Sequence, residues 1–340
     1  MSRASDVGPE LLDGLQKSLP TMPVWSIREG RSLLWWPCEL RQVLAIEEPR
    51  TDMGIAVCKL TIRTQLIQDV AIVGKTLDLL AGLNRMACMS ALVHDETDRS
   101  IALHTSFYVH EGSLGWITRL ASFASVAQMA EAQTMVDGLQ TLLCESGGSG
   151  DKAASAHPVK GVRTQVDDMR AVIGGLRKGA VGMPPSYGLE DFQESTDSYG
   201  PDPSLMTNFD EGGLTAEFQF HGQAPAAARL LARMLGQRPP GFGSALFQAD
   251  ANAQHPSYGA GCLTLLALPV SDEDPQLVNR LNLQERDDWT RAQGIGAWCL
   301  GDKGITHAAF LPAAVRRPGT FGMIYRNAAL RSAWAGRFLS

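Results

Sequence analysis

Two arginines that occupy matching places in the chain have the chemistry to bind a carboxylate. Arg119 lies in the stretch Ser-Leu-Gly-Trp-Ile-Thr-Arg-Leu-Ala (residues 113–121), and Arg326 lies in Thr-Phe-Gly-Met-Ile-Tyr-Arg-Asn-Ala (residues 320–328). The guanidinium group presents a planar fork of donors that fits a carboxylate. Each arginine is expected one turn into a helix, where it either ties the helix to a sheet or binds an acidic peptide. Both are candidate peptide-binding residues.

A second candidate contact is the pair Trp35 and Trp36, which ends a strand-like run at residues 32–36. Successive side chains of a strand point to opposite faces of the sheet, so both rings cannot enter the same core. One tryptophan is expected to face the helices. The other is expected on the open face, where it contacts the other half of the chain, a ligand peptide or solvent.

The sequence contains no recognised catalytic, nucleotide-binding or calcium-binding motif. Its 6 cysteines are far apart, with no Cys-x-x-Cys pair and no Cys/His cluster at zinc spacing. His94, His104 and His110 border one predicted hairpin, where ordinary strand-edge histidines are favoured over a metal or acid–base site. We therefore predict no catalytic residue, no metal and no cofactor.

Composition excludes other classes of function. The 340 residues are 44% hydrophobic and 19% charged, with a net charge of −6 and no clustered basic surface. Binding to nucleic acid through counterion release needs such a surface, so no nucleic-acid partner is expected. No apolar run approaches the roughly 20 residues that cross a bilayer, and no secretory signal is visible. We expect a cytoplasmic protein without membrane insertion, whose cysteines are mostly small buried side chains.

A repeat organises the chain. Residues 113–121 and 320–328 share the order Ser/Thr, Leu/Phe, Gly, Trp/Met, Ile, any residue, Arg, any residue, Ala. Upstream of each copy stand Asp-Arg-Ser-Ile (98–101) and Asp-Lys-Gly-Ile (302–305), then Leu-Asn (83–84 and 281–282), then Cys58 and Cys262. The matches keep one order and a separation of 198–207 residues, which indicates two diverged copies of one unit.

Hydrophobic periodicity gives the elements of each copy. In the first copy we expect helices at 9–17, 73–84 and 113–143 and strands at 32–36, 39–47, 55–65, 90–94 and 100–109. In the second we expect helices at 224–235, 275–283 (extended at 285–293) and 320–338 and strands at 243–249, 261–268, 295–300 and 304–311. An extra strand is expected at 214–220, where it could extend the edge of its own sheet or of the neighbouring one, and 250–258 is expected to be a loop. The predicted fold is α+β: two tandem α-β-β-β-α-β-β-α units with antiparallel sheets and helices packed on one face.

Residues 145–213 are expected to connect a first unit at 1–144 to a second at 214–340. The connector begins with a flexible Gly/Ser piece at 145–151 and regains helical spacing at 159–178. Residues 186–212 carry seven acidic residues and no Lys or Arg. The acidic stretch is either a solvated loop with aromatic anchors or an internal mimic of a ligand peptide that covers a groove as a lid. The aromatic residues concerned are Tyr187, Phe192, Tyr199 and Phe209.

This order of elements resembles that of the YbjN-like domains and the class I type III secretion chaperones. The stretches that carry the resemblance are residues 80–84, 91–107 and 115–130 and their counterparts 277–282, 297–311 and 322–338. The family has no catalytic motif to carry over. The resemblance implies a protein that wraps an extended client segment by strand addition and apolar grooves, usually as a homodimer. Here two copies in one chain could replace the dimer.

The sequence thus favours a non-enzymatic peptide- or protein-binding module, a cytoplasmic chaperone or adaptor whose partner is a client protein or peptide. It would be a monomer with pseudo-dimeric repeats or a homodimer. Two alternatives stay open. One is an enzyme or small-molecule binder whose pocket lies between the copies and uses scattered residues such as His104 and Arg119. The other is a structural subunit of a larger assembly.

Overall fold

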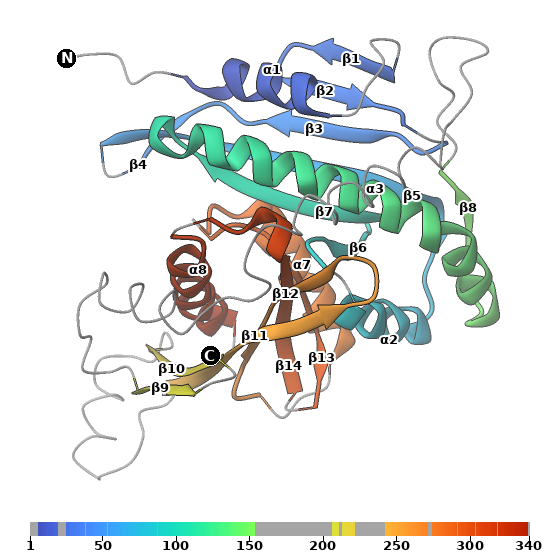
Figure 1. The fold of residues 1–340 in the computed structure, drawn as a ribbon. Helices are drawn as coiled ribbons and strands as arrows, with labels where there is room; N and C mark the ends of the chain where they lie inside the picture. Colours follow the sequence, from blue (N-terminus) through green and yellow to red (C-terminus); the bar gives the residue numbers. More distant parts are fainter. Residues whose placement is uncertain are drawn as a thin grey trace.

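The fold is known from a computed structural model, which describes residues 6–19, 25–37, 39–52, 54–86, 88–153, 206–210, 213–221, 242–270, 274–290, 292–302, 304–317 and 319–338. These residues form two antiparallel sheets with helices packed against them, so the predicted α+β class is confirmed (Figure 1). The helices predicted at 159–178 and 224–235 lie outside the described residues. So do Tyr187, Phe192 and Tyr199 of the proposed lid.

The first unit holds the first sheet, with strand order β1-β2-β3-β5-β7-β6 and with β4 and β8 paired to β5. Helices α1 and α3 cover one face of this sheet, where Leu60, Ile62 and Phe107 are fully buried (Figure 1). The elements are α1 (Gly8–Ser18), β1 (Ser26–Glu29), β2 (Ser32–Trp35), β3 (Gln42–Ile46), β4 (Arg50–Asp52), β5 (Ile55–Ala71), α2 (Gly74–Leu83), η2 (Asn84–Met86), β6 (Ala91–Asp95), β7 (Ser100–Val109), η3 (Glu111–Ser113), α3 (Leu114–Glu145) and β8 (Ser149–Lys152).

The second unit holds the second sheet, with strand order β9-β10-β11-β12-β14-β13. Helix α8 covers one face, and α7 lies at the edge beside β13 (Figure 1). The elements are β9 (Met206–Asp210), β10 (Gly213–His221), β11 (Phe242–His255), β12 (Gly259–Ala267), α7 (Pro275–Asp287), β13 (Ala297–Gly301), β14 (Gly304–Pro312), η5 (Ala313–Val315), α8 (Thr320–Ala335) and η6 (Gly336–Phe338).

The two sheets share one strand order. In the first unit α2 separates β5 from the hairpin of β6 and β7, and α3 follows that hairpin. In the second unit α7 separates β12 from the hairpin of β13 and β14, and α8 follows that hairpin. Helix α1 has no counterpart among the described residues of the second unit. The break between β3 and β4 corresponds to the bulge between Asp250 and Ala253 of β11. The strand registers show which residues of the two sheets correspond. Thr61 pairs with Ser106 in the first sheet, and Leu263 pairs with Phe310 in the second. Since Ser106 and Phe310 are equivalent residues of β7 and β14, Thr61 corresponds to Leu263. The sequence match of Cys58 to Cys262 is therefore two positions out of register.

The repeated Leu-Asn pair has the same structural role in both units. The Asn84 side chain donates to the Leu92 carbonyl oxygen and accepts from the Leu92 amide, at 2.9 and 2.7 Å. Asn282 does the same for Trp298, at 3.0 and 2.8 Å. Both asparagines are buried, where an unpaired amide would be costly. Asn84, which follows the last residue of α2, and Asn282, which lies within α7, therefore each fix a helix to the edge strand that follows it.

The units pack through the sheet faces that α3 and α8 leave open. Every described residue of β7 and of β14 is buried, whereas β3 alternates between buried and half-buried residues. Ser106 of β7 exchanges two backbone hydrogen bonds with Gly294, at 2.8 and 3.2 Å. At the equivalent place in β14, the Phe310 amide donates to the Cys88 carbonyl oxygen at 3.0 Å. The contact is reciprocal, as between two subunits related by a two-fold axis.

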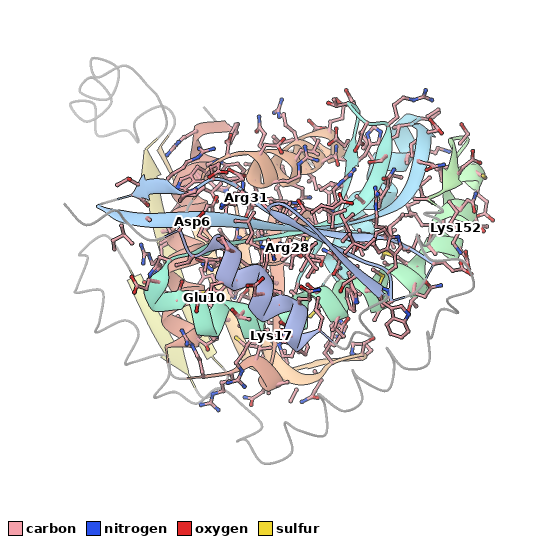
Figure 2. The ribbon with its side chains drawn as sticks, turned by 90° about the horizontal axis from the view of Figure 1, so that it is seen from above. Asp6, Glu10, Lys17, Arg28, Arg31 and Lys152 are labelled. Atoms are coloured by element: carbon pink, nitrogen blue, oxygen red, sulfur yellow. The ribbon has the colours of Figure 1, made fainter. Side chains whose placement is uncertain are left out.

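Arg31 fixes the start of α1 to the first sheet, next to the turn between β1 and β2 (Figure 2). Its guanidinium group contacts a carboxylate oxygen of Asp6 at 2.6 Å and donates to the carbonyl oxygens of Ile46 and Glu47. This cation holds the pKa of Asp6 at about 2, below its usual value of 3.8. Together with burial, the Asp6 carboxylate raises the pKa of the Cys58 thiol to about 11, so this thiol is protonated at neutral pH.

The structure buries both tryptophans. Trp35 is 0% exposed in the core of the first unit, as expected for the ring that faces the helices, and Trp36 is 5% exposed. Of the alternatives for the second ring, contact with solvent or with a ligand peptide does not fit this burial. Neither ring is accessible to a ligand peptide.

Several element predictions also need correction. Strands β1 and β4 were not expected, and β8 replaces part of the flexible piece by pairing with β5. The predicted loop 250–258 is largely strand, because β11 runs on to His255. The predicted edge strand at 214–220 is β10, yet β9 lies outside it and carries Phe209, which pairs with Leu214 and so is not in a lid loop. Helices α2 and α7 pack against each other between the units, not on one face of their own sheets.

The close backbone approach at Gly294 yields a stability prediction. A Cβ atom there would lie 2.2 Å from Ser106 Oγ, so Gly294→Ala is expected to lower the free energy of unfolding by about 1–3 kcal/mol. Gly138→Ala is the matched control, because nothing lies within 4 Å of a Cβ atom in that turn of α3. It is expected to raise stability by up to about 1 kcal/mol. Urea unfolding of both variants measures the difference, and equal stabilities would contradict the reciprocal interface.

Candidate functional site: a cleft between the units

A cavity at the boundary of the two units has a volume of about 400 Å³. We call it the inter-unit cleft. Four segments build it: the hairpin of β4 and β5, the end of β7 with the start of α3, the loop between α7 and β13, and the start of α8. Its lining residues are Asp52, Ile55, Val57, Tyr108, His110, Gly112, Ser113, Trp116, Ile117, Trp289, Gln293, Arg317, Gly319, Met323, Arg326 and Asn327.

The repeated sequence stretch supplies two walls of the cleft. Residues 113–121 form the first turns of α3 and residues 320–328 those of α8, and both turns line the same cavity. Trp116 and Met323 hold the same position in the repeat, as do Arg119 and Arg326. The repeat therefore converges on one place in the structure, although the two stretches lie some 200 residues apart in the sequence.

The third wall is a segment that only the second unit contains. Twelve positions separate Asn282 from Gly294, whereas four separate the equivalent residues Asn84 and Cys88. The additional residues lengthen α7 and form the loop that carries Trp289 into the cleft. This loop makes the cleft asymmetric even though the sheets around it are alike.

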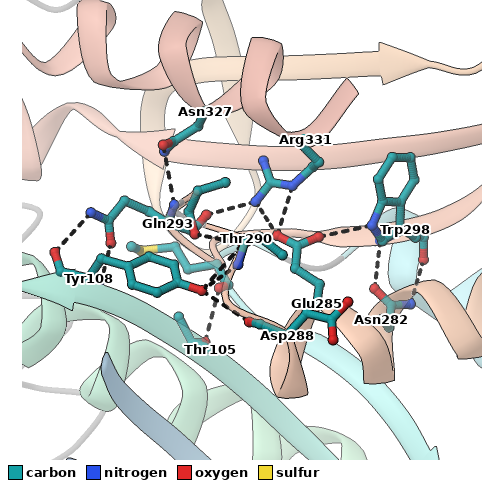
Figure 3. Close-up of polar contacts among 12 residues, drawn as sticks. Thr105, Tyr108, Asn282, Glu285, Asp288, Thr290, Gln293, Trp298, Asn327 and Arg331 are labelled. Carbon is teal, nitrogen blue, oxygen red and sulfur yellow. Dashed lines mark hydrogen bonds and ion pairs between the residues drawn. The ribbon is translucent and has the colours of Figure 1, made fainter. Parts of the chain in front are cut away.

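Tyr108 joins this loop to the first unit (Figure 3). Its hydroxyl accepts from the Thr290 amide at 2.9 Å and donates to the Asp288 carbonyl oxygen at 3.1 Å. The Gln293 side chain pairs with the Tyr108 backbone, accepting from its amide and donating to its carbonyl oxygen. The backbone amide of Gln293 donates to the side-chain oxygen of Asn327 in α8. One polar network thus fixes three walls of the cleft.

Buried charged side chains next to this network hold the end of α7 in place. Lys59 is 0% exposed, and its ammonium group donates to the carbonyl oxygens of Arg286 and Asp288 at the end of α7. Burial lowers the pKa of Lys59, partly opposed by nearby carboxylates. Glu285 accepts from Arg331 of α8 at 2.5 and 2.8 Å. These contacts hold the loop that carries Trp289 between β5 and α8.

Arginines surround the cleft. The Arg317 guanidinium carbon lies 4.1 Å from the centre of the Trp116 ring, and that of Arg50 lies 4.8 Å from the Trp289 ring. Burial and the neighbouring cation Arg119 lower the pKa of Arg317. Arg119 and Arg326 are both exposed, and neither forms an ion pair or hydrogen bond with any residue that the structure describes. Aromatic faces and cations together suit a ligand that carries both apolar groups and negative charge.

The structure brings together only part of the predicted site. Arg326 lines the cleft, and Arg119 stands beside Arg317 at its margin. Trp35 and Trp36 are buried elsewhere. His104, named for the pocket alternative, lies at a separate cavity of about 10 Å³ between the units. Burial and the cations Arg286, Lys59 and Arg63 hold the pKa of His104 well below its usual value, so this histidine is neutral.

Sequence reasoning missed Trp116, Trp289 and Arg317 as site residues. Trp116 was not among the candidate site residues, although its place in the repeated stretch was a signal; it is half-buried and also packs against the core. Trp289 lies in the predicted helical extension at 285–293, which has no counterpart in the first copy. In the described part of the chain, no three His, Cys, Asp or Glu side chains are placed to hold a metal ion. Likewise, no helix described here is long and apolar enough to span a membrane.

The equivalent hairpin of the second unit makes a closed contact instead of a cleft. Tyr258, in the turn between β11 and β12, packs its ring 6.0 Å from that of Phe123. Its hydroxyl lies 3.2 Å from both the Ala127 carbonyl oxygen and Glu131 of α3. In the first unit the corresponding hairpin places Ile55, 52% exposed, at the cleft. One of two equivalent positions is sealed by a tyrosine, and the other is open.

Removing the Lys59 ammonium group should loosen the wall that carries Trp289. Lys59→Met leaves two buried carbonyl oxygens without their donor, so the free energy of unfolding should fall by about 2 kcal/mol or more. Lys152→Met is the control, because this half-buried lysine forms ion pairs with the exposed carboxylates of Glu39 and Asp137 (Figure 2). Its loss should cost less than about 1 kcal/mol. Chemical unfolding followed by tryptophan fluorescence tests this, and an equal cost at both sites would argue against a supporting role of Lys59 at the end of α7.

Burial of the Glu131 carboxyl group beside Tyr258 should make stability depend on pH. Burial raises the pKa of Glu131 from 4.5 to about 7, against the hydrogen bonds that lower it. The folded protein then keeps a proton that the unfolded chain releases, so stability is expected to fall as pH rises from about 4.5 to about 7. Glu131→Gln should remove this part of the pH dependence. Unfolding free energies across that range measure it, and identical profiles for both proteins would refute the assignment.

Comparison of the chain with protein-family models, with curated proteins and with solved structures finds no match. The resemblance to YbjN-like domains and secretion chaperones therefore stays a prediction from the order of the elements and their apolar pattern. The lining residues of the inter-unit cleft give it aromatic walls, arginines and an opening to solvent, set between two units of like topology.

Proposed function

We propose that this chain is a non-enzymatic peptide- or protein-binding module that holds a segment of a client protein in the inter-unit cleft. The observation that carries the proposal is the convergence of both repeated stretches on one cleft of about 400 Å³. Trp116 and Trp289 supply large, rigid contact surfaces of the kind that dominate binding energy. Ile55 adds an exposed apolar side chain.

The sheet edges between the units support the cleft as the binding place. At the β6 edge, the His94 amide donates to the Asn279 side chain, and that side chain donates back to the His94 carbonyl oxygen, at 2.9 and 3.0 Å. Helix α2 and η2 lie against β13 in the same region (Figure 1). Strand addition needs an unpaired edge. A client is therefore expected in the cleft and not on β6 or β13.

The tandem arrangement supports a chaperone or adaptor of the cytoplasm, as the resemblance implies. In this proposal an ancestral unit was doubled, and the reciprocal contact of β7 and β14 takes the place of a homodimer interface. A monomer would then suffice to form the cleft, because each wall comes from the same chain.

A second candidate function is the binding of a small molecule in the same cleft, as a binder or as an enzyme. The specific observation in its favour is the volume, which falls within the roughly 300–1,000 Å³ of small-molecule pockets. The peptide proposal is preferred because the cleft is open to solvent at Ile55 and Arg326. A small molecule is usually enclosed much more completely.

Filling the cleft tests the proposal. Met323→Trp places a large ring in the cleft, and Leu142→Trp places the same ring on an exposed turn of α3 that does not line it. Peptides selected from a random display library should bind the unmodified protein and Leu142→Trp alike. They should bind Met323→Trp at least about tenfold more weakly, a loss of about 1.4 kcal/mol. Calorimetric titration measures this, and equal affinities for both variants would rule out the cleft.

A further inference from the structure

The charges of the inter-unit cleft point to the chemistry of its client. We infer that it recognises an acidic segment of a partner protein, whose Asp or Glu carboxylates are bound by Arg326 and Arg317 while a neighbouring apolar side chain packs at Ile55 and Trp289. The inference rests on the proposed function, because it names the kind of segment that the cleft binds. Inorganic phosphate and small carboxylates share part of this chemistry and are outcomes of the test.

The first argument is the local sign of the charge. The chain as a whole carries −6, yet the lining of the cleft contains Arg317 and Arg326 against the single carboxylate of Asp52. Arg119 adds a third positive charge beside Arg317. A positive site on a negative protein favours anionic partners at short range, because distant surface charges are screened at physiological ionic strength.

The second argument is that the repeated arginines are not used to hold the fold. The sequence allowed a role for Arg119 and Arg326 in tying helix to sheet. Across the described ranges, neither makes an ion pair or hydrogen bond, and both are exposed. By contrast, Arg31, Arg286 and Arg331 each pair with a carboxylate. The alternative that stays compatible with the contacts is recognition of an external carboxylate.

The third argument is the position of Arg317. The carbon of its guanidinium group lies over the Trp116 ring, 4.1 Å from the ring centre. Its side chain forms no hydrogen bond or ion pair with the residues that the structure describes, so its planar fork of N–H donors can meet a carboxylate. The positive charges of Arg119 and Arg317 repel each other. A carboxylate bound beside them would offset that repulsion.

The fourth argument is the apolar surface next to the arginines. Ile55 is 52% exposed, and Val57, Met323 and Trp289 line the same cavity. An isolated anion would leave this surface exposed to water. A peptide that places acidic and apolar side chains next to each other would bury it, which favours a protein segment over a free anion.

Binding of defined peptides to the full chain tests the inference. The probes are short fluorescein-labelled peptides of alternating Glu and Leu, of Gln and Leu, and of Glu and Gly, measured by fluorescence anisotropy. The Glu/Leu peptide should bind at least about tenfold more tightly than either of the others. Its affinity should fall as sodium chloride is added.

The variants Arg326→Gln and Arg119→Gln remove the positive charge and keep a polar side chain that can donate hydrogen bonds. Arg326→Gln should weaken binding of the Glu/Leu peptide by about tenfold or more and leave the Gln/Leu peptide unaffected. Arg280→Gln is the matched control, because Arg280 is an exposed arginine of α7 that does not line the cleft. It should change neither affinity. Thermal unfolding of each variant establishes that it is folded.

The outcomes separate this inference from the proposed function. Equal affinity for the Glu/Leu and Gln/Leu peptides, both lost in Met323→Trp, would overturn the acidic preference while the cleft remains the peptide site. Binding that survives Met323→Trp would overturn both. Displacement of the Glu/Leu peptide by inorganic phosphate, with equal affinity for the Glu/Gly peptide, would point to a free-anion site and overturn the inference. No binding of the Glu/Leu peptide would overturn it as well.

Discussion

The arrangement of this protein depends on two strands that have both faces buried. β7 and β14 each carry a long helix on one face, and each needs a second cover for the other face because its residues there are also excluded from water. Neither unit supplies that cover itself. Each receives it from the other through the segment that follows the second helix, at Gly294 for β7 and at Cys88 for β14. Backbone pairing at both places sets the position of one sheet against the other.

The inter-unit cleft results from a departure from symmetry within this arrangement. If both hairpins met the opposing helix alike, Tyr258 on α3 would have a counterpart on α8 and no cavity would remain. The hairpin of β4 and β5 ends in a short turn with Ile55 exposed, and the longer loop after α7 brings in Trp289. The reciprocal interface thus sets the position of one sheet against the other, and these two local differences leave a cleft on one side. The cleft can therefore form without disturbing the packing of the sheets.

The sequence predicted the elements whose periodicity is set by one buried face. Helices α1, α3, α7 and α8 and strands β5, β7, β12 and β14 lie close to their expected places, because their apolar residues recur with the period of the element. β1, β4 and β8 were missed, since each is short and is defined by its partner strand more than by its own residues. For Trp36 the rule of alternation left burial, ligand contact and solvent contact open, because it gives the face of a sheet and not what covers that face. Of the site residues, Arg326 was found through the repeat, whereas Trp289 belongs to a loop that no repeat can reveal.

The polar character of the interface explains how a binding site can sit at its margin. Lys59, Tyr108 and Gln293 join the units through directional contacts, and directional contacts fix one relative position where apolar contacts alone would allow several. The same residues hold the walls of the cleft in place. The geometry of the cleft therefore depends on the geometry of the interface. A ligand that contacts Trp116 and Arg326 together bridges both units, and its binding energy adds to the adhesion between them. Recognition and the packing of the two units are therefore coupled, because the same residues that hold the sheets in register also hold Trp289 at the cleft.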